Sequence, residues 1–374
     1  MESLNRVEIS RTALRHNFLL LRKQAADATV MVMVKADGYG HGMIECAKVF
    51  SELGACAFGV AEAVEGVRLR QAGFTEPVFV LAGILPEIVP ALFKYNLTPV
   101  VVDDWVLPEL SRQAQEHNRE IGLHLKTDAG MGRQGCLFEQ VSAIVQQINR
   151  LPGLRLEGIM AHFPMADDRE SQNTSRILSR FHRIIATARE YIPEDCRLHI
   201  ANSGGLLYGI DTNLDMVRPG ISLYGCYPNG EQGGRDAKGD KLQSVMRFVT
   251  RVIQLRRVPA GTGLGYGHIF TTSRPTTLVV LPAGYEDGYL RCLSGKSSVL
   301  VKGQRAPVVG RISMNLTLVD VTDLDGVQPG DEVVLLGRQG EEGITADEIA
   351  GWMGTINYEV LCLFGNLNNR VFVD

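Results

Sequence analysis

The sequence lacks the features that mark membrane, secreted and metal-binding proteins. No run reaches the ~18 consecutive apolar residues of a membrane-spanning helix, and the N-terminus has no signal-peptide core. The seven cysteines form no CxxC pair and no cluster with histidine, which argues against a disulfide scaffold and against a metal site. We therefore expect a soluble protein with reduced thiols in the cytoplasm, with no membrane partner.

The sequence also lacks an excess of charge of either sign. Its net charge is −4, whereas a nucleic-acid-binding domain usually carries a basic patch, so we expect no nucleic-acid partner. The composition is that of an ordinary globular protein, with 45% hydrophobic and 21% charged residues. A length of 374 residues accommodates one large domain and a smaller one.

One apolar run ends in a lysine that is followed by closely spaced glycines. The run Val30–Val34 predicts a strand buried on both faces, because no polar residue alternates with the apolar ones. Lys35 comes next, ahead of Gly38, Gly40 and Gly42, which allow tight turns or a close approach to a ligand. A desolvated lysine forms Schiff bases with carbonyl compounds such as pyridoxal 5′-phosphate (PLP). On this stretch alone, a lysine that only extends its ammonium to solvent is equally favoured.

Short apolar strands and helices then alternate along the chain. Strands separated by helices pair in parallel, and eight of them predict a (β/α)₈ barrel of the TIM type. A doubly wound open sheet is the alternative, because one sequence does not reveal strand order. The predicted strands are Val30–Val34, Ala57–Val60, Pro77–Leu81, Thr98–Val102, Ile121–Lys126, Leu154–Met160, Arg197–Ala201 and Met216–Arg218.

The composition changes after Tyr227. Residues 228–240 are polar and rich in glycine, which predicts a linker, and short strands without long helices follow it. We expect a barrel domain over residues 11–235 and a mostly β domain over residues 236–374. Thr345 predicts the cap of one helix near the C-terminus. The predicted strands of this domain are Met246–Leu255, Thr276–Leu281, Ser298–Val301, Ala306–Val309, Leu316–Val321 and Glu332–Leu336.

Two polar loops follow the seventh and eighth predicted barrel strands. Active sites of such barrels lie at the C-terminal ends of the strands, and phosphate commonly binds after strands seven and eight. Asn202–Gly205 and Pro219–Ser222 stand at those two positions and offer a hydroxyl and backbone N–H groups. In a closed barrel strand one neighbours strand eight, so Lys35 should lie beside this phosphate site. Because PLP carries both an aldehyde and a phosphate, the combination predicts a PLP-dependent enzyme.

Three further polar residues follow barrel strands. Arg133 could bind a carboxylate with two hydrogen bonds, although a surface arginine fits the same stretch equally well. His162 follows an apolar strand, where a histidine is more often structural than catalytic. Arg218 would lie inside the barrel mouth, where a guanidinium needs a partner, and it is placed to face the PLP ring.

Taken together, these motifs resemble those of the bacterial alanine racemases, which are PLP enzymes of fold type III. The resemblance covers nearly the whole chain. It implies a PLP-binding barrel, a β domain joined by the N-terminal strand (residues 1–10), and a homodimer with shared active sites. It also implies interconversion of L- and D-alanine, which supplies D-alanine for peptidoglycan. The matching motifs are residues 34–42, Asp128–Arg133, Ala201–Ser203, Arg218–Ile221 and Gly263–Gly267.

The resemblance also implies a role for each matching residue. Lys35 would bond to PLP and act as one base, and Tyr266 from the partner's β domain would be the other. Arg133 and the backbone of Met314 from the other subunit would bind the substrate carboxylate, and Lys126 matches a position that is carbamylated in many members. The residues implied to hold PLP are Tyr39, His162, Ser203, Arg218, Gly220, Ile221 and Tyr358.

Three segments depart from the family pattern. Asn315 stands where aspartate is usual, Glu286 stands where alanine is usual, and the tail at residues 364–370 differs from the usual segment. All three bear on the identity of the substrate, so alanine is the first expectation and serine or a broader range is the second. A PLP decarboxylase of the same fold is opposed by Arg218, and a non-catalytic PLP-binding protein by the β domain that carries Tyr266.

Overall fold

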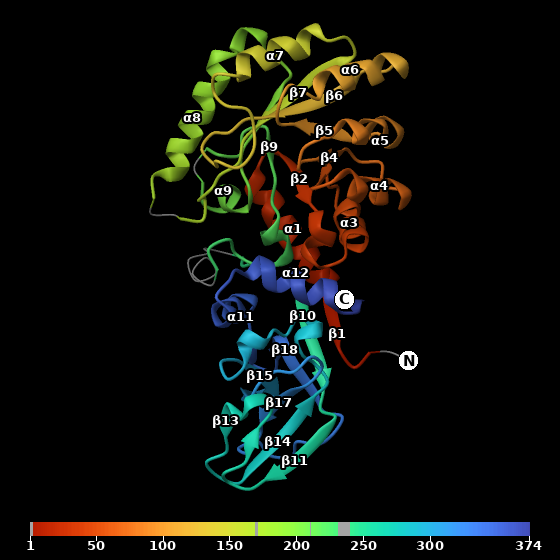
Figure 1. Cartoon of the computed structure of the whole chain (residues 1–374). Helices are drawn as coiled ribbons and strands as arrows, with labels where there is room; N and C mark the ends of the chain where they lie inside the picture. The colour runs from red at the N-terminus through yellow and green to blue at the C-terminus, as the bar shows by residue number, and fades with distance from the viewer. Residues whose placement is uncertain (1–2, 169–170, 210, 231–239) are drawn as a thin grey trace.

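The computed structural model describes residues 3–168, 171–209, 211–230 and 240–374. A barrel surrounded by helices and a mostly β part are stacked end to end, with helix α12 (Asn357–Leu367) between them (Figure 1). The predicted linker at residues 228–240 lies largely outside the described residues. Among the described residues, no helix combines the length and the apolar character needed to cross a bilayer.

Eight parallel strands form the barrel in the order β8-β7-β6-β5-β4-β3-β2-β9. The two end strands are joined beyond their last ladder pairs, since Arg218 N donates to Ala201 O over 2.9 Å and Asp215 N donates to Leu198 O over 3.1 Å. The predicted barrel is therefore confirmed, and the open sheet is excluded. The strands are β2 (Thr29–Met33), β3 (Ala57–Val60), β4 (Val78–Val80), β5 (Thr98–Val101), β6 (Ile121–Lys126), β7 (Leu154–Met160), β8 (Arg197–His199) and β9 (Met216–Val217).

Amphipathic helices cover the outside of the barrel (Figure 1). Ser10 caps the first of them, because Ser10 Oγ accepts a hydrogen bond from Ala13 N over 3.1 Å. Leu14, Phe18 and Leu21 form its buried face. The longer helices are α1 (Arg11–Ala25), α3 (Met43–Glu52), α4 (Ala63–Gln71), α5 (Val89–Tyr95), α6 (Leu107–Glu116), α7 (Val141–Arg150) and α8 (Asn173–Thr187).

A ten-stranded sheet dominates the β part, and it contains the first and the last strand of the described residues. Strand β1 pairs antiparallel with β10 and parallel with β20. The sheet consists of β1 (Arg6–Ser10), β10 (Met246–Arg251), β11 (Gln254–Val258), β14 (Thr276–Leu281), β15 (Ser298–Val301), β16 (Gln304–Val309), β17 (Thr317–Asp320), β18 (Glu332–Gln339), β19 (Glu342–Ile344) and β20 (Arg370–Val373). Strands β12 (Gly263–Leu264) and β13 (Phe270–Thr271) form a separate pair.

The prediction of one continuous strand over Met246–Leu255 is wrong. The chain changes partners in its middle, because Val252 N donates to Asp331 O whereas Ile253 N donates to Val280 O. The segment is therefore two strands, of which β10 pairs with β18 and β11 with β14. An apolar pattern predicts extended backbone but carries no information about which strand lies alongside it.

The prediction of a single helix near the C-terminus is also wrong. The predicted helix is α11 (Ala346–Met353), and its cap is Thr345 Oγ1, which accepts from Glu348 N over 3.0 Å. A second helix, α12, follows it and was not predicted. It contacts the barrel on one side and the β part on the other, so it lacks the continuous polar face that identifies a surface helix.

Helix α12 approaches the turn after Lys35 through two glycines. A Cβ atom at Gly365 would overlap Gly40 O, and a Cβ atom at Gly40 would overlap Leu361 O. Both obstacles are backbone atoms, which cannot move aside as a flexible side chain does. The contact between α12 and the barrel therefore requires glycine at both positions.

We predict that Gly365→Ala lowers the free energy of unfolding by about 1–3 kcal/mol, which is typical of overpacking. Gly351→Ala in α11 is the matched control, because a Cβ at Gly351 would meet nothing within 4 Å. The control should raise stability by about 0.5–1 kcal/mol, since alanine favours helix over glycine. Urea unfolding followed by circular dichroism measures both changes, and equal stability of the two variants would contradict this account.

Candidate active site

The C-terminal ends of the barrel strands surround a pocket of about 720 Å³. A cavity of about 750 Å³ at the opposite end of the barrel has no lysine among its described lining residues. The first pocket brings together most of the site residues predicted from the sequence, namely Lys35, Tyr39, Lys126, Arg133, His162, Ser203, Arg218, Gly220, Ile221 and Tyr358.

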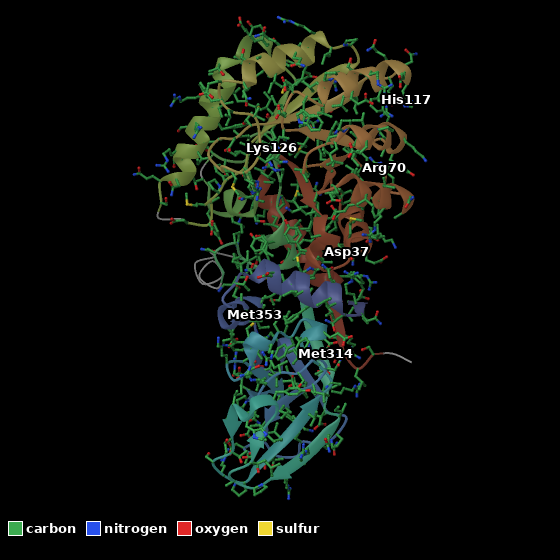
Figure 2. All side chains as sticks on the ribbon, in the orientation of Figure 1. Asp37, Arg70, His117, Lys126, Met314 and Met353 are labelled. Carbon is green, nitrogen blue, oxygen red and sulfur yellow. The ribbon has the colours of Figure 1, made fainter. Side chains whose placement is uncertain are left out.

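Two predicted site residues lie outside this pocket. Tyr266 and Met314 belong to the β part, where 69% and 53% of their surfaces are exposed. Figure 2 shows Met314 in the β part, well separated from Lys126 in the barrel. The sequence interpretation assigns both to the other subunit's site, and that assignment stays a prediction.

Lys35 lies in the pocket at the start of an unusual turn. Burial lowers the pKa of its ammonium, and the positive charges of Arg133 and Arg218 add to that effect. The following segment, α2 (Lys35–Tyr39), is left-handed, with φ angles of 54° at Ala36, 52° at Asp37 and 54° at Tyr39. A left-handed conformation costs roughly 1–2 kcal/mol for each non-glycine residue, so the surroundings must impose the turn.

The two loops after β8 and β9 meet beside Lys35. Ser203 Oγ accepts from Gly220 N over 2.9 Å and from Ser222 N over 3.3 Å. A Cβ atom at Gly220 would overlap Tyr39 Oη, so glycine there allows the tyrosine hydroxyl to reach the loops. Ser222 Oγ is buried without a hydrogen-bond partner among the described residues. These hydroxyl and N–H groups suit an anion such as a phosphate.

Arg218 is buried deep in the pocket and bonds only to neutral acceptors. Its guanidinium donates to Ala161 O over 2.7 Å and to Ile200 O over 3.1 Å, and it lies 2.8 Å from His199 Nδ1. Burial lowers the pKa of Arg218 to about 9, so it stays protonated at neutral pH. A guanidinium in this position can donate to a ring nitrogen but cannot give it a proton.

Two histidines continue the hydrogen bonding behind Arg218. His199 Nε2 lies 2.7 Å from His124 Nδ1. Burial and the charge of Arg218 lower the pKa of His199 well below its usual value, and burial lowers that of His124 to about 3. Since arginine only donates, His199 Nδ1 must accept and His199 Nε2–H must donate to His124. Sequence reasoning missed both histidines, although each interrupts an apolar strand.

His162 stands beside Arg218 at the pocket wall. Its Nδ1 is 3.4 Å from Arg218 Nη2, and its Nε2 is 3.4 Å from Asn202 Nδ2. Burial, reinforced by Arg218, lowers the pKa of His162 well below its usual value. The His162 imidazole is therefore neutral, and it can pack against the ring of a ligand in the pocket without adding another positive charge.

Lys126 is held by a residue that sequence reasoning missed. Its Nζ donates to Gln134 Oε1 over 2.7 Å, and Gln134 Nε2 donates to Ala82 O over 2.6 Å. Burial, followed by the charges of Arg133, Arg218 and Lys35, lowers the pKa of Lys126 to about 8. A substantial fraction of this amine is therefore neutral slightly above physiological pH. Its carbamylation stays a prediction.

The two single-residue departures from the family pattern touch each other. Asn315 Nδ2 donates a hydrogen bond to the Glu286 carboxylate. Their backbones are also tied together, because Glu286 N donates to Met314 O over 3.1 Å and Tyr285 N donates to Ser313 O over 3.2 Å. The negative charge that asparagine lacks at position 315 is thus present on its neighbour, Glu286.

Comparison with known proteins identifies the family. A model of the alanine racemase N-terminal domain matches residues 9–228, and a model of the C-terminal domain matches residues 245–372. The chain belongs to the alanine racemase family. It is 39% identical over 357 residues to an alanine racemase of Halothermothrix orenii, covering 95% of this chain and 93% of that one. It is 40% identical over 369 residues to one of Syntrophobacter fumaroxidans, covering 98% and 96%.

Solved structures of alanine racemases share its fold. The Bacillus anthracis enzyme with bound L-Ala-P has a TM-score of 0.92 and 29% identity, covering 100% of this chain and 96% of that one. The Bartonella henselae enzyme with covalently bound pyridoxal phosphate has a TM-score of 0.89 and 28% identity, covering 99% of each chain. These likenesses confirm the predicted family, the PLP-dependent racemase class and the cofactor.

We predict that Lys126 titrates near pH 8 in the PLP-free protein kept free of CO₂. After reductive ¹³C-methylation of the lysines, its NMR signal, assigned with Lys126→Met, should shift with that midpoint, whereas exposed lysines titrate near ~10.4. Because the unfolded chain binds more protons between about 8 and 10.5, this group makes stability rise with pH across that window. A midpoint at the value of exposed lysines would contradict the burial argument.

Proposed function

We propose that this protein interconverts L- and D-alanine with PLP, using Lys35 and Tyr266 of the partner subunit as bases on opposite faces of the substrate. The observation that carries the proposal is one pocket that contains Lys35, Arg218 and an anion site, which consists of the Ser203 hydroxyl and the loop that begins at Gly220. The names of the similar proteins agree with it. In the cell, the D-alanine product would supply peptidoglycan synthesis in the cytoplasm.

The residues present suit PLP. Ser203, Gly220, Ile221, Tyr39 and Tyr358 would hold its phosphate through hydroxyl and N–H groups. Arg218 would donate to its ring nitrogen, and His162 would pack beside the ring. When bound, PLP supplies an electron sink that makes the α-proton of an amino acid removable.

Proton transfer at the substrate Cα needs one base on each face. Lys35 Nζ is suited to one face, because its lowered pKa increases the fraction of neutral amine that can accept a proton. Arg133 would bind the substrate carboxylate at the pocket mouth, together with the Met314 backbone of the partner subunit. With its carboxylate bound, the substrate would present its Cα hydrogen to the neutral amine of Lys35.

The exposed apolar surface of the β part supports shared active sites in a homodimer. Besides Tyr266, the residues Ile269, Tyr285, Met314 and Leu316 are between 37% and 53% exposed. Contiguous exposed apolar groups are typical of interaction surfaces. We infer that this surface covers the barrel mouth of a second subunit. We also infer that the barrel domain comprises residues 11–235 and the β domain residues 236–374.

The Glu286–Asn315 pair favours a second candidate, a racemase of broader range. It lies beside Met314, so its carboxylate would border the substrate side chain in the partner's site. A fixed carboxylate there could accept a hydrogen bond from a serine hydroxyl or pair with a cationic side chain.

We predict α-proton exchange with racemisation when the PLP-loaded protein is incubated in D₂O with L-alanine. L-serine and L-lysine are incubated separately, with deuterium read by mass spectrometry and chirality by chiral chromatography. Activity on alanine alone supports alanine racemase, whereas comparable rates on serine or lysine support the broader enzyme. Exchange without formation of the D-isomer would refute the role of Tyr266.

We also predict that Lys35→Ala and Tyr266→Phe each abolish racemisation but restore it when mixed and allowed to exchange subunits. A mixed dimer has one site with both bases intact, so random exchange should recover about a quarter of the wild-type activity. The Lys35→Ala/Tyr266→Phe double variant mixed with wild type is the control, because its mixed dimers have no intact site. No recovery after proven subunit exchange would contradict shared sites.

A further inference from the structure

The left-handed turn after Lys35 is held by contacts from the barrel and from the C-terminal end of the chain. Its own elements supply part of the hold, since Glu65 Oε1 accepts from Ala36 N over 2.7 Å and Asp37 Oδ1 accepts from Met43 N over 2.9 Å. Other contacts come from the C-terminal end of the chain. Figure 2 shows Asp37 near the level at which the barrel meets α12.

Arg370 of β20 contacts both a side chain and the backbone of this turn. Its Nη2 forms an ion pair with Asp37 Oδ2 over 2.6 Å, and its Nη1 donates to Gly40 O over 3.2 Å. Both side chains are largely shielded, with 26% of Arg370 and 22% of Asp37 exposed. Burial alone would raise the pKa of Asp37, but the Met43 N–H and Arg370 outweigh it and lower that pKa.

A second arginine, Arg68, also lies near Asp37, but its side chain is more exposed and, among the described residues of the turn, it contacts only the Asp37 side chain. Arg68 Nη2 lies 3.5 Å from Asp37 Oδ1, and half of its side chain is exposed. Within the part of the chain that the structure describes, Arg68 makes no hydrogen bond to the turn's backbone, and it belongs to α4 of the barrel. Arg370 instead connects the turn to the C-terminal sheet, because β20 pairs with β1.

We propose that the Asp37–Arg370 ion pair positions Lys35, by holding the left-handed turn that sets where Lys35 Nζ lies in the pocket. The inference rests on the proposed function, in which Lys35 bonds to PLP. Through Arg370, strand β20 would therefore help to fix the position of Lys35. A turn released from Arg370 could relax toward right-handed backbone, which would move Nζ relative to the anion site while leaving that site in place.

The test compares two ligands that differ only at the group Lys35 would bond. PLP has an aldehyde, whereas pyridoxamine 5′-phosphate has the same ring and phosphate but no aldehyde. Affinity of the PLP-free protein for each is measured by equilibrium titration. For Arg370→Gln we expect PLP affinity to fall about tenfold, which is about 1.4 kcal/mol, and pyridoxamine phosphate affinity to change less than about twofold. Arg68→Gln is the matched control and should change neither.

Asp37→Asn is the second variant, in case Arg370→Gln does not fold. Asparagine tolerates the left-handed conformation and keeps an acceptor for Met43 N. It removes the charge that pairs with Arg370 and, at 3.5 Å, with Arg68, and Arg68→Gln measures the loss of the second pair by itself. The same selective loss of PLP affinity is expected. Equal loss for both ligands, no loss for either, or the same loss in Arg68→Gln would each overturn the proposal.

Lys35→Ala separates failure of this inference from failure of the proposed function. In that variant the preference for PLP over pyridoxamine phosphate should disappear. If the wild-type protein has no greater preference than Lys35→Ala, Lys35 does not bond to PLP and the proposed function is wrong. If wild type shows the preference and Arg370→Gln retains it fully, only the positioning role is wrong.

Discussion

Four basic side chains meet in one pocket that has no carboxylate among its described lining residues. Lys35, Lys126, Arg133 and Arg218 all face this space, and each of the two lysines has its pKa lowered by burial and by the neighbouring cations. Such a cluster is unfavourable by itself, because like charges repel and burial removes their hydration. Negative groups brought by ligands would relieve it. The same repulsion and burial lower the pKa of both lysines, which increases the fraction of neutral, nucleophilic amine.

The surrounding structure limits that repulsion without neutralising it. Arg218 bonds to carbonyl oxygens and to a neutral histidine, so its charge is stabilised by dipoles and remains available to the pocket. Gln134 does the same for Lys126. An acidic partner at either position would form a stronger pair but would cancel the field. The choice of neutral partners is consistent with a site that binds anions.

Much of this arrangement could be predicted from the sequence. The run Val30–Val34 is continuous in apolar residues, and local chemistry therefore identified the buried strand and the lysine that follows it. The two loops after β8 and β9 followed from the general geometry of parallel barrels. Helix α12 and the break at Val252 could not be predicted, because both depend on which elements lie alongside. Likewise, His124 and His199 lie 75 residues apart, and only the folded barrel brings them together.

The pairing of β1 with β10 and β20 has a consequence for synthesis on the ribosome. Strand β1 precedes the barrel strands, whereas its two partners, β10 and β20, follow them, and Val7, for example, pairs with Arg370. The barrel strands lie between these segments, so the barrel has all of its strands while β1 still has two open edges. Unpaired edges invite association with other chains. Such long-range pairing also slows folding, because a large loop must close before the contact forms. Completion of the C-terminal sheet therefore waits until β20 has been synthesised, after all of the barrel strands.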